Sequence, residues 1–265
     1  MCSFVVNAVK RWIPPLVLAL TAGAATAANV RVYTGDPVPV GNGTARVIVT
    51  ATPQGVPRSV SVAFSGDALE GLPAAQPDRS EWEYVVPMPK GAPSTGYDHV
   101  GLNWNPAGHP PEGVYTHPHF DVHFYLIDRA QQEAVTFKDE AAARGLTPPD
   151  PRIVPSGYVI PPDTAVEQMG VHGVDPQSRE FHGKPFTYTF IYGYYQGRMV
   201  FLEPMVTLDF FRSGADVTMP VKRPQAYSLP GYYPAKYRVG YDPVRKEYRV
   251  SLLDLRQYPV KTARR

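Results

Sequence analysis

Three of the chain's seven histidines lie in one ten-residue stretch, THPHFDVHFY, at residues 116–125. In an extended strand the side chains alternate between two faces, so His117, His119, Asp121 and His123 share one side. The residues between them are mostly apolar and make an ordinary core face. Imidazole and carboxylate groups are common protein ligands of divalent metals. The stretch therefore indicates a metal site on one face of a strand whose other face is buried.

The spacing along the strand limits which of these side chains can share one ion. Residues two apart are about 6.5–7 Å apart at the backbone, and both can reach an ion at roughly 2.0–2.1 Å. Residues four apart, such as His119 and His123, are about 13 Å apart, so both can bind one ion only if the strand bends or bulges. The shorter spacing is met by His117 with His119, by His119 with Asp121, and by Asp121 with His123.

Further ligands must come from distant segments, and two residues stand out. Glu203 carries the sole charge in the apolar run MVFLEPMVTL, where a buried carboxylate needs a cation or a proton. His172 lies in the glycine-containing segment MGVHG, where the backbone can approach closely. We expect a divalent ion (zinc, manganese, iron or copper) to be bound by a set of five residues. These are His119, Asp121, His123, His172 and Glu203.

Each assignment has a structural alternative. The strand face can be a hydrogen-bonded polar face, or can act in acid–base chemistry without a metal. Glu203 can point to water from an edge strand, and His172 can be a loop histidine without a special role. The histidines in Pro- or Gly-rich loops are expected at the surface, although one of them, His182, is close enough to His172 to replace a ligand. These loop residues are His99, His109 and His182.

Four segments resemble an uncharacterised family of bacterial secreted β-proteins, a domain of unknown function. They are GLNWNPAGHPPEGVY, PHFDVHFY, MGVHGVDP and FTYTFIYGYYQGRMVFLEPMVT. The similar stretch covers about residues 95–212, and PHFDxHF is its most specific element. The resemblance implies the same five metal ligands and disfavours His117. It implies no particular activity.

Residues 1–27 have the organisation of a secretory signal peptide. Lys10 and Arg11 precede a short apolar run, and Ala25-Thr26-Ala27 is a small-x-small cleavage site. We therefore expect a periplasmic or secreted protein, and the alternative is an uncleaved membrane anchor.

Removal of this segment changes the charge and cysteine content of the chain. Removing Lys10 and Arg11 from the 26 basic residues leaves 24, equal to the 24 acidic residues. The mature chain is then neutral, which argues against nucleic acid or an anionic membrane as a partner. The single cysteine, Cys2, is also lost, so the mature protein forms no disulfide.

The rest of the chain, residues 28–265, is expected to be a single mainly β domain: an antiparallel barrel or sandwich with one main helix. Its 30 prolines and 22 glycines separate short apolar runs, as in strands joined by turns. Residues 28–90 are a candidate N-terminal β subdomain. The helix is predicted from Asp128, which can cap it, to Arg144, before Gly145.

Two functions fit these features. The first is a metal-dependent enzyme of unknown reaction, in which an open metal position polarises a small-molecule substrate or activates water. Tyr125, Tyr188 and Tyr192 would then be proton donors or substrate contacts. The second is a non-catalytic ligand-binding protein or oligomeric envelope protein, with a structural metal or none. Its 17 tyrosines suit subunit interfaces as well as pockets. Four protein ligands would favour a structural metal, and three with an open position would favour catalysis.

Overall fold

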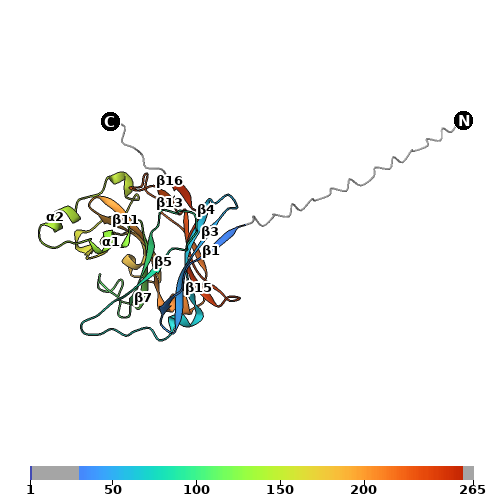
Figure 1. Ribbon diagram of the computed structural model, residues 1–265, viewed down its shortest axis with the longest axis horizontal. Helices are drawn as coiled ribbons and strands as arrows, with labels where there is room; N and C mark the ends of the chain where they lie inside the picture. The colour runs from blue at the N-terminus through green and yellow to red at the C-terminus, as the bar shows by residue number, and fades with distance from the viewer. Residues whose placement is uncertain (2–29, 259–265) are drawn as a thin grey trace.

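The computed structural model describes residue 1 and residues 30–258 (Figure 1). Residues 2–27 of the predicted signal peptide lie outside the described residues. Most of the regular secondary structure of the described chain is short antiparallel strands, which confirms the mainly β class predicted from the sequence. No helix in the described part is long and apolar enough to span a membrane.

The first sheet joins strands from both ends of the chain. Strands β3 and β4 form a hairpin, and β4 pairs with β15 near the C-terminus. Strands of residues 31–65 therefore do not form a sheet of their own. The strand order is β1 (Arg31–Thr34), β3 (Gly43–Ala51), β4 (Pro57–Ser65), β15 (Glu247–Leu253), β14 (Lys236–Asp242) and β12 (Val217–Pro220), with β2 (Val38–Val40) paired to β3.

The second sheet is a curled half-barrel, and it contains the histidine-rich strand, β7, near its middle. Its order is β5 (Trp82–Pro87), β6 (His99–Asn105), β7 (His119–Tyr125), β11 (Arg198–Thr207), β10 (Tyr188–Tyr195), β9 (Gly170–Gly173) and β8 (Ala165–Val166). A separate two-stranded sheet pairs β13 (Gly231–Tyr233) with β16 (Arg256–Tyr258).

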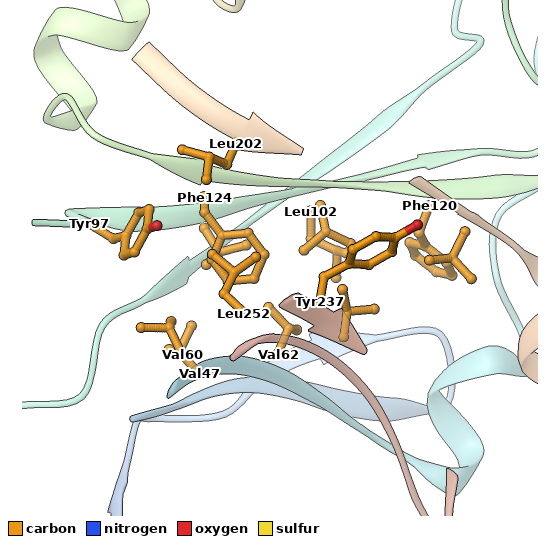
Figure 2. Close-up of a cluster of buried hydrophobic side chains, with 14 of the residues drawn as sticks. Val47, Val60, Val62, Tyr97, Leu102, Phe120, Phe124, Leu202, Tyr237 and Leu252 are labelled. Carbon is orange, nitrogen blue, oxygen red and sulfur yellow. The ribbon is translucent and has the colours of Figure 1, made fainter. Parts of the chain in front are cut away.

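The main core lies between the two large sheets. Figure 2 shows Phe120, Phe124 and Leu202 from the second sheet facing Val60 and Val62 from the first. Phe120 and Phe124 alternate along β7 with its ligand-type residues, as period-two alternation predicts. All seven residues of β7 are buried. The polar face of β7 is therefore enclosed as well, under the segments between β6 and β7 and between β7 and β10.

The predicted helix over residues 128–144 is two short helices, α1 (Arg129–Glu133) and α2 (Ala141–Gly145). Asp128 caps α1 as expected, because its side chain accepts a hydrogen bond from the backbone N–H of Gln131. Asp139 has φ 49°, a left-handed conformation that a continuous helix cannot contain. The other helices are α3 (Leu208–Arg212) and the 3-10 helices η1 (Gly66–Leu69), η2 (Pro151–Ile153), η3 (Pro162–Thr164) and η4 (Arg179–His182). Figure 1 shows α1 and α2 beside the second sheet, on the side away from the first.

Candidate metal centre

The polar face of the second sheet holds two groups of ligand-type side chains. We call His123, His172 and Glu203 the His123 cluster, and His109, His119 and Asp121 the His119 cluster. Within each cluster, one ligand atom from each residue lies within 4.8 Å of the others. The five residues expected at one ion are thus divided between two clusters. The division follows from β7 itself, which pairs with β6 without a register shift. His119 and His123 are four residues apart on this strand, so about 13 Å of backbone separates them.

The pairing of β11 with β7 places two members of the His123 cluster next to each other. Leu202 pairs with Phe124 and Met205 with Asp121, so Glu203 of β11 lies opposite His123 of β7. Glu203 Oε1 lies 3.5 Å from His123 Nε2, and Glu203 Oε2 lies 3.6 Å from His172 Nε2. Two ligands bound at about 2.1 Å to one tetrahedral ion are about 3.4 Å apart. Both nitrogen–oxygen separations are therefore close to those of ligands on a common ion, and one ligand atom from each of the three residues lies within 4.8 Å of the others.

Hydrogen bonds fix which ring nitrogen of each histidine faces the glutamate. His172 Nδ1 lies 2.8 Å from the carbonyl oxygen of Thr164, which can only accept, so Nδ1 donates. His123 Nδ1 lies 3.0 Å from Asn103 Oδ1. The amide of Asn103 is itself oriented, because its Nδ2 donates to Glu81 Oε1 at 2.5 Å. In the neutral rings both Nε2 atoms therefore keep a free lone pair directed at Glu203.

The His123 cluster is almost closed to solvent. The side chains of His123 and Glu203 are 1% and 2% exposed, and that of His172 is 13% exposed. Burial lowers the pKa of His123 to about 3 and also lowers the pKa of His172. Burial, together with the negative charges of Asp121 and Glu81, raises the pKa of Glu203 well above its usual range. Without a cation, the favoured state is two neutral imidazoles and a protonated acid.

One aromatic ring supports both imidazoles of the His123 cluster. The Phe201 ring centroid lies 4.7 Å from that of His123 and 5.3 Å from that of His172. The ring occupies space over Gly193 of β10, where an added Cβ would lie 2.1 Å from Phe201 ring atoms. Glycine at position 193 is thus needed for Phe201 to reach the histidines.

The His119 cluster combines two residues of β7 with a loop residue. His119 Nε2 lies 3.0 Å from Asp121 Oδ1, and His109 Nε2 lies 3.4 Å from Asp121 Oδ2. Asn105 of β6 donates to Asp121 Oδ2 at 2.7 Å. Burial alone raises the pKa of Asp121, but the neighbouring imidazoles hold it well below its usual range. Burial lowers the pKa of His109, but the hydrogen bond and charge of Asp121 outweigh it and raise the pKa to about 9.

Sequence reasoning missed three residues of these clusters and their surroundings. His109 was expected at the surface, yet it contacts the buried Asp121. Asn103 and Asn105 orient a ligand in each cluster, and their alternation with apolar residues in GLNWNP was a signal that could have found them. His109 had no such signal, because loop residues lack a periodic pattern.

Other side chains named from the sequence lie elsewhere. The surface position expected for His99 is wrong: it is a buried residue of β6 that hydrogen-bonds Asp98 and Gln132. His182 is exposed and contacts the carbonyl oxygen of Pro176. Tyr188 and Tyr192 belong to the core between the two sheets, because β10 turns its alternate residues to that side. Tyr125 does lie on the polar face, with its ring stacked 5.6 Å from that of His123.

Two cavities in the described part of the chain are lined by no member of the two clusters. One, of about 450 Å³, lies among the prolines of residues 148–162 and reaches Tyr194. The other, of about 340 Å³, lies at the edge of the two sheets, near Glu180 and Lys222. Neither cluster is therefore the floor of either of these two cavities.

Comparison with known proteins gives one partial match. A family model described as TTHB210-like, hypothetical protein TTHB210, matches residues 53–104. No curated protein and no solved structure matches the chain. The chain is thus similar to an uncharacterised family over β4, β5 and most of β6, rather than over the segments around β7. The matched stretch includes Glu81 and Asn103, which orient His123, and it ends before the members of both clusters.

Proposed function

We propose that this protein binds a divalent metal ion through His123, His172 and Glu203. The observation that carries the proposal is the pair of free Nε2 lone pairs directed at one buried carboxylate. Each histidine uses its Nδ1 for a hydrogen bond to a fixed oxygen, as metal-bound histidines usually do. This arrangement sets the ring orientation before the ion binds.

A hydrogen-bonded network without metal explains the same contacts less well. A protonated Glu203 carries one hydrogen and can satisfy one of the two Nε2 atoms. The N–O separations of 3.5 and 3.6 Å also exceed the usual 2.7–3.2 Å of a hydrogen bond. His123 Nε2 and Glu203 Oε2 have no hydrogen-bond partner among the described residues. Such buried atoms cost about 1–3 kcal/mol each unless something binds them, and an ion would bind all three side chains at once.

The ligand set agrees with a catalytic site. Two imidazoles and one carboxylate suit zinc, and also manganese, iron or copper. Three protein ligands leave a coordination position for water or substrate, whereas structural zinc sites usually have four protein ligands. This supports a metal-dependent enzyme, in which the ion polarises a small-molecule substrate or activates water.

A structural metal in a non-catalytic protein is the second candidate. The observation that favours it is the burial of the cluster, together with the position of both cavities away from its ligands. The signal peptide predicted from residues 1–27 supports a periplasmic or secreted location for either protein. A homo-oligomer with a small-molecule ligand fits the second one.

Elemental analysis of the protein purified from the periplasm tests the proposal. We expect His123→Ala, His172→Ala and Glu203→Gln each to lose about one equivalent of metal per chain relative to the unsubstituted protein. His182→Ala, an exposed histidine outside both clusters, is the matched control and should lose none. Full metal content in all three variants would exclude this site.

The coordination of the ion distinguishes the two candidates. Cobalt(II) would replace the native ion, and azide would be added as an external ligand. A change in the visible absorption spectrum means that a position is open, as catalysis requires. An unchanged spectrum, combined with a large loss of thermal stability on metal removal, would favour the structural role.

A further inference from the structure

We infer that the His119 cluster is a second cation site, filled independently of the first, whose third ligand is supplied by a loop. His119 and Asp121 come from β7, and His109 comes from the segment between β6 and β7. The cluster shares no residue with the His123 cluster. This inference goes beyond the proposed function and can fail separately from it.

The first support is a pair of buried polar atoms that face each other. His119 Nδ1 lies 2.6 Å from the carbonyl oxygen of His117 and donates to it, so in the neutral ring Nε2 keeps its lone pair. That Nε2 lies 3.0 Å from Asp121 Oδ1, and both atoms lack a hydrogen-bond partner among the described residues. The two side chains are 0% and 4% exposed. A lone pair against a carboxylate at this distance is repulsive unless a cation or a proton lies between them.

The distances suit a metal. Two ligands at about 2.1 Å from an ion are about 3.0 Å apart at a right angle and about 3.4 Å apart at a tetrahedral angle. The separations in the cluster are 3.0 Å from His119 to Asp121 and 3.4 Å from His109 to Asp121. Asn105 holds the carboxylate in place from the neighbouring strand.

The division of the ligands makes this a separate site. No residue of the His119 cluster belongs to the His123 cluster, so neither ion needs a ligand of the other. Asp121 and His123 are neighbours on one face of β7, about 6.5–7 Å apart at the backbone. Each cluster would therefore bind its own ion, side by side along β7.

The second site is more open than the first. The side chain of His109 is 34% exposed, whereas the most exposed ligand of the His123 cluster, His172, is 13% exposed. The loop still places His109 firmly. Its backbone N–H donates to the carbonyl oxygen of Tyr115 at 3.0 Å, and its ring packs 4.8 Å from that of His119. An ion at this site thus has a ligand that solvent can reach, and we expect it to exchange faster.

Zinc loading of the full mature protein tests the inference. The loaded protein is passed through a desalting column, its zinc content is measured, and zinc transfer to a colorimetric chelator is followed over time. We expect two equivalents per chain, released in a fast and a slow phase. His109→Ala should lose one equivalent and the fast phase, while His123→Ala should lose the slow phase. His117→Ala, which removes a nearby exposed side chain, is the matched control and should release zinc as the unsubstituted protein does.

The outcomes separate the two sites. One equivalent that is lost with His123→Ala and kept with His109→Ala would overturn the second site and leave the first. One equivalent with the opposite behaviour would support the second site and remove the proposed function. A second equivalent that survives both His109→Ala and Asp121→Asn would be adventitious zinc and would also overturn the inference. Circular dichroism of His109→Ala checks folding, which is expected to be intact because the residue lies on a partly exposed loop.

Discussion

His172 Nε2 lies 3.6 Å from Glu203 Oε2, although the two residues belong to strands that are not paired. In the sheet, β10 lies between β9 and β11. His172 pairs with Gly193 of β10, which has no side chain to separate the two ligands. The Phe201 ring fills the space over Gly193 and contacts His172. The curl of the sheet and one glycine thus bring distant ligands together.

Gly193→Ala should damage the site without changing a ligand. The new Cβ would lie 2.1 Å from the Phe201 ring, so the ring must move away from His123 and His172. Overpacking of this kind typically costs about 1–3 kcal/mol. We expect a lower free energy of unfolding in urea and weaker zinc binding in a chelator competition. The double variant Gly193→Ala/Phe201→Leu should recover part of the stability and part of the zinc affinity. If Gly193→Ala alone changed neither quantity, this role of Gly193 would be contradicted.

Asn103→Ala should weaken metal binding at the His123 cluster by about 10–100-fold, the usual effect of removing a partner that orients a ligand. His123 Nδ1 would lose its acceptor, and the ring would no longer present a fixed Nε2. Asn105→Ala is the matched control on the same strand, because Asn105 orients Asp121 instead. Calorimetric titration with zinc measures the affinity of the Asn103→Ala and Asn105→Ala variants. Equal effects of the two substitutions on the slow-exchanging ion would be inconsistent with this division.

Metal binding at the His123 cluster should release a proton from Glu203. Its pKa is raised well above the usual range by burial and by the charges of Asp121 and Glu81, so the metal-free protein holds it protonated. The ion requires the carboxylate, and the proton leaves as the ion enters. Calorimetry at neutral pH in buffers of different ionisation enthalpy measures the number of protons released per ion bound. Glu203→Gln should abolish the release from this site, and an identical value in the unsubstituted protein would argue against it.

Two buried groups should make opposite contributions to the stability of the metal-free protein as the pH falls from about 6.5 toward 4.5. The pKa of His123 is lowered to about 3 in the folded state, so the unfolded chain takes up protons first. Each pH unit costs at most about 1.4 kcal/mol for one such group. The raised pKa of Glu203 opposes this loss, because the folded state keeps that proton over the same interval while the unfolded state does not.

Urea unfolding with a chelator present, at several pH values, separates these two contributions. As the pH falls, His123→Gln should gain stability relative to the unsubstituted protein, because the histidine that titrates on unfolding is gone. Glu203→Gln should lose stability relative to it, because the opposing group is gone. Parallel pH profiles for both variants and the unsubstituted protein would count against the proton assignments.

Much of the fold was predictable because alternation along β7 is a local property. Phe120, Val122 and Phe124 had to share a face, and that face is the core. Glu203 was also visible, because a charge in an apolar run signals a buried acid. The division into two clusters was less accessible, since it depends on which distant strands flank β7. The break in the predicted helix depends on the left-handed Asp139 and on the buried contacts of Gln132, and neither follows from helix-forming composition.

The burial of β7 on both faces has a consequence for sequence change. Inserting or deleting one residue inside HFDVHFY would exchange the two faces, so that phenylalanines would enter the polar site and imidazoles and a carboxylate would enter the core. A shift of two residues would keep each side chain on its own face but match it with different partners across β6 and β11. The length of this strand is therefore under tighter constraint than the identity of many residues in it, and homologous chains should align through β7 without gaps.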